Sequence, residues 1–367
     1  MILHLLFDDI FGEYAILQFS GREWFSEFVV INNSLKFIHI SENIRVIKPG
    51  SEEFEQLKSN IGKYDAVVFH GLFYPWQESL MRVIPDHVKV AWVFWGGEIY
   101  GRKDLTRQFL TPLSKAILDI HSLKKKIQNR NTSCGYEFPF DLFRRIDYCL
   151  TDVPEDYSFV RSYFRSSIKE LWYNYYSVEE TIGELSSSFV EGSNILVGNS
   201  CTIECNHLDG FRRISSLSLS DSQIIVPLSY GDPWLRNLLL KEGRRRFGSR
   251  FYPLIEFLPR SEYNALIKSC AVAIMPHYRP QAFGNILTAL WLGTRVYLSE
   301  KNMLFSFFKR IGTVVFSIEN DLKKSNQSVL LPLSMEETLQ NRAVISSVYS
   351  KEVMREKNLE LVNILNQ

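Results

Sequence analysis

Short apolar runs alternate with longer amphipathic stretches along most of the chain, and no other feature limits its possible folds as strongly. An apolar run too short for a helix, followed by a stretch with helical periodicity, is typical of a buried parallel strand and its crossover helix. The first half predicts strands at 2–7, 27–31, 36–40, 65–70, 88–94 and 148–151, and helices at 51–61, 75–83, 105–130 and 156–164. The second half predicts strands at 194–198, 223–228, 251–254, 271–275, 294–298 and 314–316, and helices at 208–217, 232–247, 260–269, 284–292 and 335–366. The pattern therefore predicts an α/β chain with two doubly wound sheets.

A stretch rich in Ser, Gly and Glu, at 181–193, separates the two sets of strands and has the composition of a linker. We expect an N-terminal domain over 1–185 and a C-terminal domain over 186–345. A closing helix over 346–367 can pack back on the N-terminal domain. Two Rossmann-like domains of this kind would face each other across a cleft, where ligands bind at the carboxyl ends of the strands.

The composition excludes several classes of protein. With 367 residues, 46% of them apolar, the chain is too long for a disulfide-stapled mini-protein and too apolar for a disordered one. A net charge of +1 argues against a general nucleic-acid binder, which needs a broad basic face. No run reaches the roughly 18 apolar residues of a membrane span. The five scattered cysteines lack a second pair of metal ligands, so we expect reduced thiols and no metal.

Polar loops follow three of the strands predicted in the second half. Their notable residues are Gly198, Asn199 and Ser200 in the first loop, Tyr230 in the second, and Arg279, Gln281, Gly284 and Asn285 in the third. Backbone N–H groups, side-chain amides, an arginine and a helix N-terminus can together hold a diphosphate. Tyr230 could stack on a base or a sugar. Each loop taken singly is also consistent with an ordinary turn.

The strand ends of the first half carry candidates for a general base. Asp9, His70 and Glu98 each follow or end a predicted strand, so all three should lie at one edge of the first sheet. Glu98 is the first choice because two glycines before it allow a tight turn. The alternatives are a satisfied histidine at a strand end and an acid at a helix N-terminus. Trp95 and Tyr100 could form a platform for an acceptor sugar or lipid, or belong to the core.

Two basic clusters interrupt the neutral background. The segment 101–130 carries eight bases against two acids, interleaved with apolar residues, which suits a helix lying on an anionic membrane. A helix that packs on the core and has a solvated basic end explains the same pattern. The second cluster, at 241–250, is consistent with a basic helix C-terminus.

Five stretches occur in an order that resembles one family of enzymes: 69–73, 92–100, 195–200, 226–230 and 281–293. The chain resembles the TDP-Fuc4NAc:lipid II Fuc4NAc transferases (4-alpha-L-fucosyltransferases), which are glycosyltransferases of the GT-B fold. The resemblance implies transfer of a 4-amino-4,6-dideoxyhexose from a dTDP-sugar to a polyprenyl-diphosphate-linked saccharide, in the synthesis of enterobacterial common antigen or O-antigen. It also implies a hexosyltransferase that needs no cofactor or metal and is peripheral to the cytoplasmic face of the bacterial inner membrane.

Other functions fit the sequence too. The loop after Ser200 and the length of 105–140 depart from the family pattern. A GT-B glycosyltransferase with another nucleotide sugar, a scaffold with a degenerate donor site and a sugar-nucleotide epimerase therefore stay open. The donor sugar, the acceptor hydroxyl, the anomeric outcome and the choice of base are undecided by the sequence.

Overall fold

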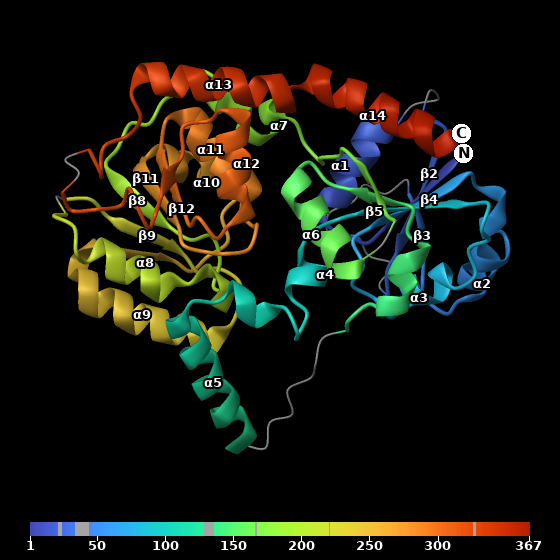
Figure 1. Cartoon of the computed structure of the whole chain (residues 1–367), viewed down its shortest axis with the longest axis horizontal. Coiled ribbons are helices and arrows are strands. Elements are labelled where there is room, and N and C mark those ends of the chain that lie inside the picture. The colour runs from blue at the N-terminus through green and yellow to red at the C-terminus, as the bar shows by residue number, and fades with distance from the viewer. Residues whose placement is uncertain (21–23, 34–43, 128–135, 166, 220, 326–327) are drawn as a thin grey trace. The chain divides into compact units, whose positions relative to one another are not determined.

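Two parallel sheets organise the computed structural model, which describes residues 1–20, 24–33, 44–127, 136–165, 167–219, 221–325 and 328–367 (Figure 1). The chain divides into two units. Unit 1 contains Met1–Arg102, Cys134–Ser177 and Lys351–Gln367, and unit 2 contains Lys103–Ser133 and Val178–Ser350.

Unit 1 is built on a seven-stranded parallel sheet in the order β3-β2-β1-β4-β5-β6-β7. Its strands are β1 (Ile2–Leu6), β2 (Ser26–Ile31), β3 (Arg45–Ile47), β4 (Ala66–His70), β5 (Lys89–Val93), β6 (Tyr148–Leu150) and β7 (Lys169–Leu171). Its helices are α1 (Ile10–Phe19), α2 (Glu52–Ser59), α3 (Pro75–Met81), α4 (Gly97–Tyr100), α6 (Pro154–Phe164) and α14 (Lys351–Asn366). Every residue of β1 and β4 is buried, as expected for central strands covered on both faces.

Unit 2 is built on a six-stranded parallel sheet in the order β10-β9-β8-β11-β12-β13. Its strands are β8 (Asn194–Val197), β9 (Ile224–Pro227), β10 (Phe251–Leu254), β11 (Cys270–Met275), β12 (Arg295–Leu298) and β13 (Phe316–Ser317). Its helices are α5 (Pro112–Ile127), α7 (Val178–Ile182), α8 (His207–Ile214), α9 (Pro233–Phe247), α10 (Arg260–Lys268), α11 (Phe283–Leu292), α12 (Met303–Ile311) and α13 (Met335–Tyr349). A short 3-10 turn, η6 (Ile203–Cys205), lies between β8 and α8.

Each sheet has one topological switch point, where the strand order reverses direction. In unit 1 the switch point lies between β1 and β4, and in unit 2 it lies between β8 and β11. The loops that leave the carboxyl ends of such a strand pair diverge and leave a crevice, which is where open α/β sheets bind ligands. Ligand-binding residues are therefore expected in the loops that begin at Phe7, Gly71, Gly198 and Pro276.

The α/β class and the two doubly wound sheets predicted from the sequence are confirmed. The expected helix at 105–130 is divided in two, since Pro112 opens α5 as its first residue after a 3-10 turn at Thr106–Phe109. Helix α1 was not predicted because it is apolar around most of its circumference and has no clear periodicity. The strand expected at 36–40 lies outside the described residues.

The two units differ from the sequence-based domain boundaries at 103–133 and at 178–185. The segment Lys103–Ser133, assigned above to the N-terminal domain, belongs to unit 2. Helix α14 belongs to unit 1, where the Lys89 ammonium group donates to the Ile364 carbonyl oxygen at 2.8 Å. No helix among the described residues is long and apolar enough to cross a membrane.

Candidate functional site

The loop after β8 needs a glycine at its first position. Gly198 has a φ of +68°, and a Cβ atom there would lie 2.7 Å from Nε2 of His207. Any larger residue would therefore meet both backbone strain and a buried imidazole. The Gly198 N–H donates to the Ile274 carbonyl oxygen at 3.0 Å, which joins β8 to β11 at the switch point.

Asn199 of this loop meets the loop after β11, and Ser200 lies beside Cys205 of η6. The Gln281 amide donates to Oδ1 of Asn199 and to Sγ of Cys205, each at 3.0 Å. Ser200 is buried, and its hydroxyl lies 3.4 Å from Sγ of Cys205. The structure thus brings together three of the predicted residues, and it adds Cys205, for which only a reduced thiol is predicted above. The four cysteines in the described part of the chain are free and buried.

The loop after β11 is held from behind by Asn302. The Asn302 amide donates to the carbonyl oxygens of His277 and Arg279, at 3.1 Å and 3.2 Å, and its Oδ1 caps α12 by accepting from the Leu304 N–H. Asn302 is fully buried. Sequence reasoning missed this residue. Its signal was a possible N-cap before an apolar helix that was itself not predicted.

Helix α11 begins at this loop with an unusual backbone. Its N-cap, Ala282, has a φ of +62°, which is costly for a residue with a Cβ atom and points to a constrained functional turn. No acidic residue lies in its first turn, and no side chain caps it. Gly284 lies in that first turn, where it has no side chain to cover the backbone. The Asn285 amide donates to the Tyr263 hydroxyl at 3.5 Å.

Four buried side-chain atoms at this edge of unit 2 have no hydrogen-bond partner. They are Nε2 of His207, Nε2 of His277, Nε of Arg279 and Oε1 of Gln281. Buried polar atoms in folded proteins are nearly always satisfied, so each exception requires an explanation. All four lie near one switch point: three belong to the loop after β11, and His207 is the first residue of α8.

Of these four groups, only the Arg279 guanidinium is charged at physiological pH. Burial lowers the pKa of His277 to about 3 and that of His207 to about 4, so both imidazoles are neutral at physiological pH. Arg279 is the cation of the set, and no acidic side chain in the described part of the chain forms an ion pair with it. Tyr230 lies at the end of β9 and is 52% exposed, so its ring is accessible at the same sheet edge.

Unit 1 is different, because a chain of polar groups that begins at its carboxyl edge is satisfied internally. Trp95 Nε1 donates to the Tyr175 hydroxyl at 2.7 Å, and that hydroxyl lies 2.8 Å from Nδ1 of His70. His70 Nε2 lies 3.1 Å from Nδ1 of His4, and His4 Nε2 lies 3.3 Å from the Ser26 hydroxyl. The Trp95 indole can only donate, and this sets the direction of the chain. Trp95 donates to Tyr175, Tyr175 to His70, His70 to His4 and His4 to Ser26, so every group is satisfied.

This chain of hydrogen bonds corrects the prediction that His70 is a candidate base. His70 is 1% exposed, and both of its ring nitrogens have partners. Burial, with a smaller effect of His4, lowers the pKa of His70 well below its ordinary value. The alternative considered above, a satisfied histidine at a strand end, describes what the structure contains.

The two candidate carboxylates have different surroundings. Glu98 is buried at the start of α4, where Oε1 accepts from Trp92 Nε1 at 2.9 Å and from the Trp95 N–H at 3.0 Å, while Oε2 has no partner. Burial raises the pKa of Glu98 to about 7. Asp9 is partly exposed and caps α1, with Oδ1 accepting from the Phe11 N–H at 2.5 Å. Asp9 therefore has a structural role, whereas Glu98 has a free oxygen and a pKa near neutrality.

Only one of the two predicted platform residues lies near the surface. Trp95 is partly exposed and packs between Phe7 and Phe11, each with its ring centre 4.9 Å away, and Phe73 at 5.7 Å. Tyr100 is fully buried, and its hydroxyl bonds to the Asp156 carboxyl group. The proposed platform role of Tyr100 is therefore wrong, because its ring belongs to the core.

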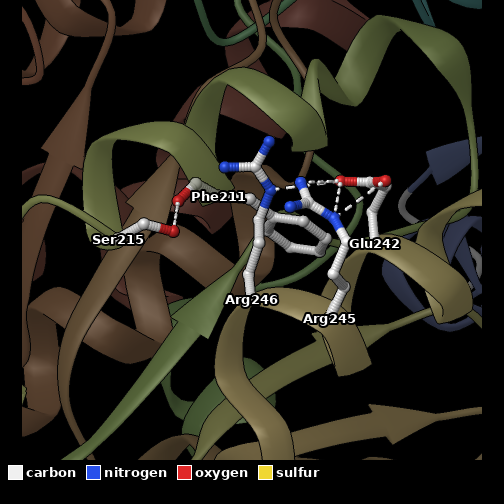
Figure 2. A network of polar contacts seen from close by, with 5 residues as sticks. All are labelled: Phe211, Ser215, Glu242, Arg245 and Arg246. Carbon is white, nitrogen blue, oxygen red and sulfur yellow. Dashed lines mark hydrogen bonds and ion pairs between the residues drawn. The ribbon is translucent and has the colours of Figure 1, made fainter.

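The basic cluster at the end of α9 is partly neutralised by the helix itself. Figure 2 shows Arg245 and Arg246 converging on Glu242, with closest N–O distances of 2.7 Å and 3.3 Å. Ser215, the residue after α8, donates instead to the carbonyl oxygen of Phe211 on its own helix. The cluster has the arrangement of a basic helix C-terminus that complements the dipole, which was the alternative considered above.

Among the described residues, no group of three or more His, Cys, Asp or Glu side chains is placed to hold a metal ion. No family model matches the chain, and no curated protein is significantly similar to it.

Solved structures similar to this chain include sugar-phosphate synthases and a glycosyltransferase. Sucrose-phosphate synthase from Thermosynechococcus elongatus has 11% sequence identity, covers 100% of this chain and 99% of its own, and gives a TM-score of 0.63. A glycosyltransferase from Rickettsia africae has 14% identity, with 99% and 98% covered and a TM-score of 0.63. HepE from Anabaena, solved with UDP and glucose, has 9% identity, with 99% of both chains covered and a TM-score of 0.61. With its two Rossmann-like units, the chain therefore has the GT-B fold of these glycosyltransferases.

Proposed function

We propose that this chain is a glycosyltransferase that binds a nucleotide sugar at the switch point of unit 2. One observation carries the proposal: four unpartnered buried polar atoms lie near the switch point, three in the loop after β11 (His277, Arg279 and Gln281) and one on His207 at the start of α8. A bound molecule with several hydrogen-bonding oxygens would satisfy them. Unpartnered buried polar atoms lower the stability of a fold, and natural proteins keep them mainly at functional sites.

A diphosphate is the ligand chemistry that fits these groups. Arg279 supplies a positive charge and a planar set of donors, and the uncapped first turn of α11 supplies N–H groups and the positive end of a dipole. The neutral imidazoles can each donate one N–H without needing a proton from solvent. When the glycosidic bond of the donor breaks, the same groups would stabilise the charge that develops on the leaving diphosphate.

The proposed donor is a dTDP-linked 4-amino-4,6-dideoxyhexose of the Fuc4NAc type. The support is the order of the five matching stretches, two of which are the loops around this site. HepE, which has the same fold, was solved with UDP-glucose as well as with UDP and glucose. The exposed ring of Tyr230 could stack on the nucleotide base at the rim of the site.

Unit 1 is the proposed site of the acceptor, a polyprenyl-diphosphate-linked saccharide. Trp95 and the phenylalanine rings around it supply an aromatic surface at the carboxyl edge of the sheet. Glu98 is the proposed general base, with Oε2 as the oxygen that takes the proton from the attacking hydroxyl. A pKa of about 7 suits this task, because the group is then part ionised and still basic at neutral pH.

We further propose that α5 holds the enzyme at an anionic membrane surface, on the cytoplasmic face of the inner membrane. Leu113, Ile120 and Leu123 on this helix are 38%, 53% and 60% exposed. Lys115 and Lys124 lie on the same helix, among the bases of the segment 101–130. An exposed apolar stripe with basic neighbours is the pattern of an interfacial helix.

A panel of nucleotides tests the proposed donor. The full chain is titrated with dTDP, UDP and GDP, and binding is measured by thermal shift and calorimetry. We expect dTDP to raise Tm more than UDP or GDP does. A preference for UDP or GDP would keep a glycosyltransferase but contradict the dTDP donor, and binding of none of the three would contradict the proposal. Nucleotide binding without transfer to any prenyl-linked saccharide would favour a scaffold with a degenerate site.

A further inference from the structure

Unit 2 contains a cavity outside the proposed nucleotide site. Its volume is about 240 Å³, and it lies between α5, η6 and the start of α9. The segment that forms one wall is anchored firmly: the buried Asn206 side chain accepts from the Thr111 N–H at 3.1 Å and donates to the Phe109 carbonyl oxygen at 3.3 Å. The Thr111 hydroxyl also donates to Asp209 at 2.6 Å. The cavity is therefore bounded by elements whose positions are fixed within unit 2.

The walls of this cavity are mainly apolar. They are formed by the side chains of Ile117, Leu118, Ile203, Trp234 and Leu235. The polar residues of the lining are already occupied in part. Asp232 caps α9 by accepting from the Trp234 and Leu235 N–H groups, and the His121 ring stacks on the Trp234 indole with ring centres 4.2 Å apart. Glu204 and Thr202 complete the lining.

The size and the surroundings of the cavity point to a hydrocarbon chain. Cavities of about 150 Å³ with apolar walls bind benzene, so this one has room for about ten carbon atoms. Its wall residue Ile117 lies one helical turn from Leu113 and Ile120, which are exposed, so an apolar path leads from the outer face of α5 to the cavity. The ammonium group of Lys124 lies 5.8 Å from the centre of the Trp234 ring, which places a cation beside the apolar walls.

We infer that this cavity binds part of the isoprenoid chain of the acceptor lipid, about two isoprene units long, with Lys124 near its phosphate end. The inference rests on the proposed function, which supplies a prenyl-linked acceptor, and it deepens that function by giving unit 2 a role in holding the lipid. A second copy of the chain is a poorer occupant, because two basic α5 helices would meet with like charges.

Binding of farnesyl phosphate tests the inference directly. The full chain is dialysed to equilibrium with radiolabelled farnesyl phosphate, in the presence of excess inorganic pyrophosphate to occupy any diphosphate site. We expect saturable binding of one molecule per chain. Leu118→Phe and Ile203→Phe each fill the cavity with a larger side chain and should weaken binding at least tenfold. Leu339→Phe, at a residue 52% exposed on α13, is the matched control and should bind like the unmodified chain.

The outcomes separate this inference from the proposed function, because nucleotide binding and Tm are measured on the same samples. Two cavity variants are used so that a fold defect in one leaves the other informative. Nucleotide binding without farnesyl phosphate binding overturns the cavity inference alone. Unchanged binding in both cavity variants places the lipid elsewhere and also overturns it. Competition by decanoate as strong as that by unlabelled farnesyl phosphate overturns the assignment to an isoprenoid chain.

Discussion

The two switch points of this protein have the same topology and opposite chemistry. In unit 1 the loops at the carboxyl edge contain aromatic rings. A chain of hydrogen bonds in which every group has a partner runs from Trp95 at this edge, through the strands, to Ser26 at the start of β2. In unit 2 the corresponding loops and the start of α8 contain Arg279 and three other buried polar groups that have unsatisfied atoms. Of the edge residues described above, unit 1 has one with an unpartnered oxygen, Glu98, whereas unit 2 has four residues with unpartnered atoms around one switch point. Two sheets of the same topology thus carry different chemistry in their loops.

The largest expected effect is on the chemistry assigned to unit 1. Glu98→Gln keeps an acceptor for Trp92 Nε1 and the Trp95 N–H but cannot take a proton. Removal of a general base costs about 10²–10⁴ in rate, so we expect turnover to fall by that factor while nucleotide affinity is unchanged. Steady-state kinetics and calorimetry on one preparation measure both. Equal losses in rate and in nucleotide affinity would contradict the assignment of catalysis to unit 1 and of nucleotide binding to unit 2.

The next effect concerns the charge in unit 2. Arg279→Ala removes the cation at the proposed diphosphate site and should weaken nucleotide binding by about 2–4 kcal/mol, with little change in Tm. Calorimetry measures the affinity. Arg245→Ala is the control, because Arg245 is an exposed arginine already paired with Glu242. If both variants bind nucleotide like the unmodified chain, Arg279 does not contact the diphosphate.

The stability of unit 1 should depend on pH through Glu98. Its pKa is raised from 4.5 to about 7 in the folded chain, so the folded state holds this proton more tightly than the unfolded state does. The stability that this provides is present below pH 4.5 and lost as the pH rises to 7. At about 1.4 kcal/mol per pH unit, the loss is about 3 kcal/mol.

Glu98→Gln isolates this contribution, because other buried acids such as Asp156 titrate in both proteins. Denaturant unfolding at pH 5 and pH 8 measures the difference. The variant should be more stable than the unmodified chain at pH 8 and about equal to it at pH 5. If the two proteins differ in the free energy of unfolding by the same amount at both pH values, folding does not raise the pKa of Glu98.

The smallest effect comes from the satisfied chain of unit 1. Tyr175→Phe leaves Trp95 Nε1 and His70 Nδ1 without a partner and should cost about 1–3 kcal/mol in the free energy of unfolding. Tyr173→Phe is the matched control, because the buried Tyr173 hydroxyl has no partner to lose. Chemical denaturation compares the two variants. Similar costs for both would mean that the chain contributes little to stability.

The sequence predicted the architecture well because it depends on patterns that are local. Buried parallel strands, turn glycines and helix caps are all visible within a few neighbouring residues, as at Gly198 and Asp232. The loops of unit 2 could be singled out for the same reason. Since Asn199 and Gln281 follow the two strands at the switch point, their meeting in space follows from the topology.

What the sequence could not give are the contacts that depend on burial and long-range packing. His70 resembled a catalytic residue until His4 and Tyr175, distant in sequence, were seen to occupy its nitrogens. Tyr100 resembled a binding residue for the same reason, although its hydroxyl reaches Asp156 in the core. The placement of α5 in unit 2 also depends on packing, through the contact of Thr111 with Asn206.

Hydrogen–deuterium exchange of the full chain, with and without dTDP, tests the central claim most directly. If unit 2 holds the nucleotide at its switch point, dTDP will slow exchange in the loops at 198–206 and 276–286 and leave those at 7–9 and 71–75 of unit 1 unchanged. Protection of the unit 1 loops alone, or of neither set while dTDP is bound, would contradict the assignment of the two edges.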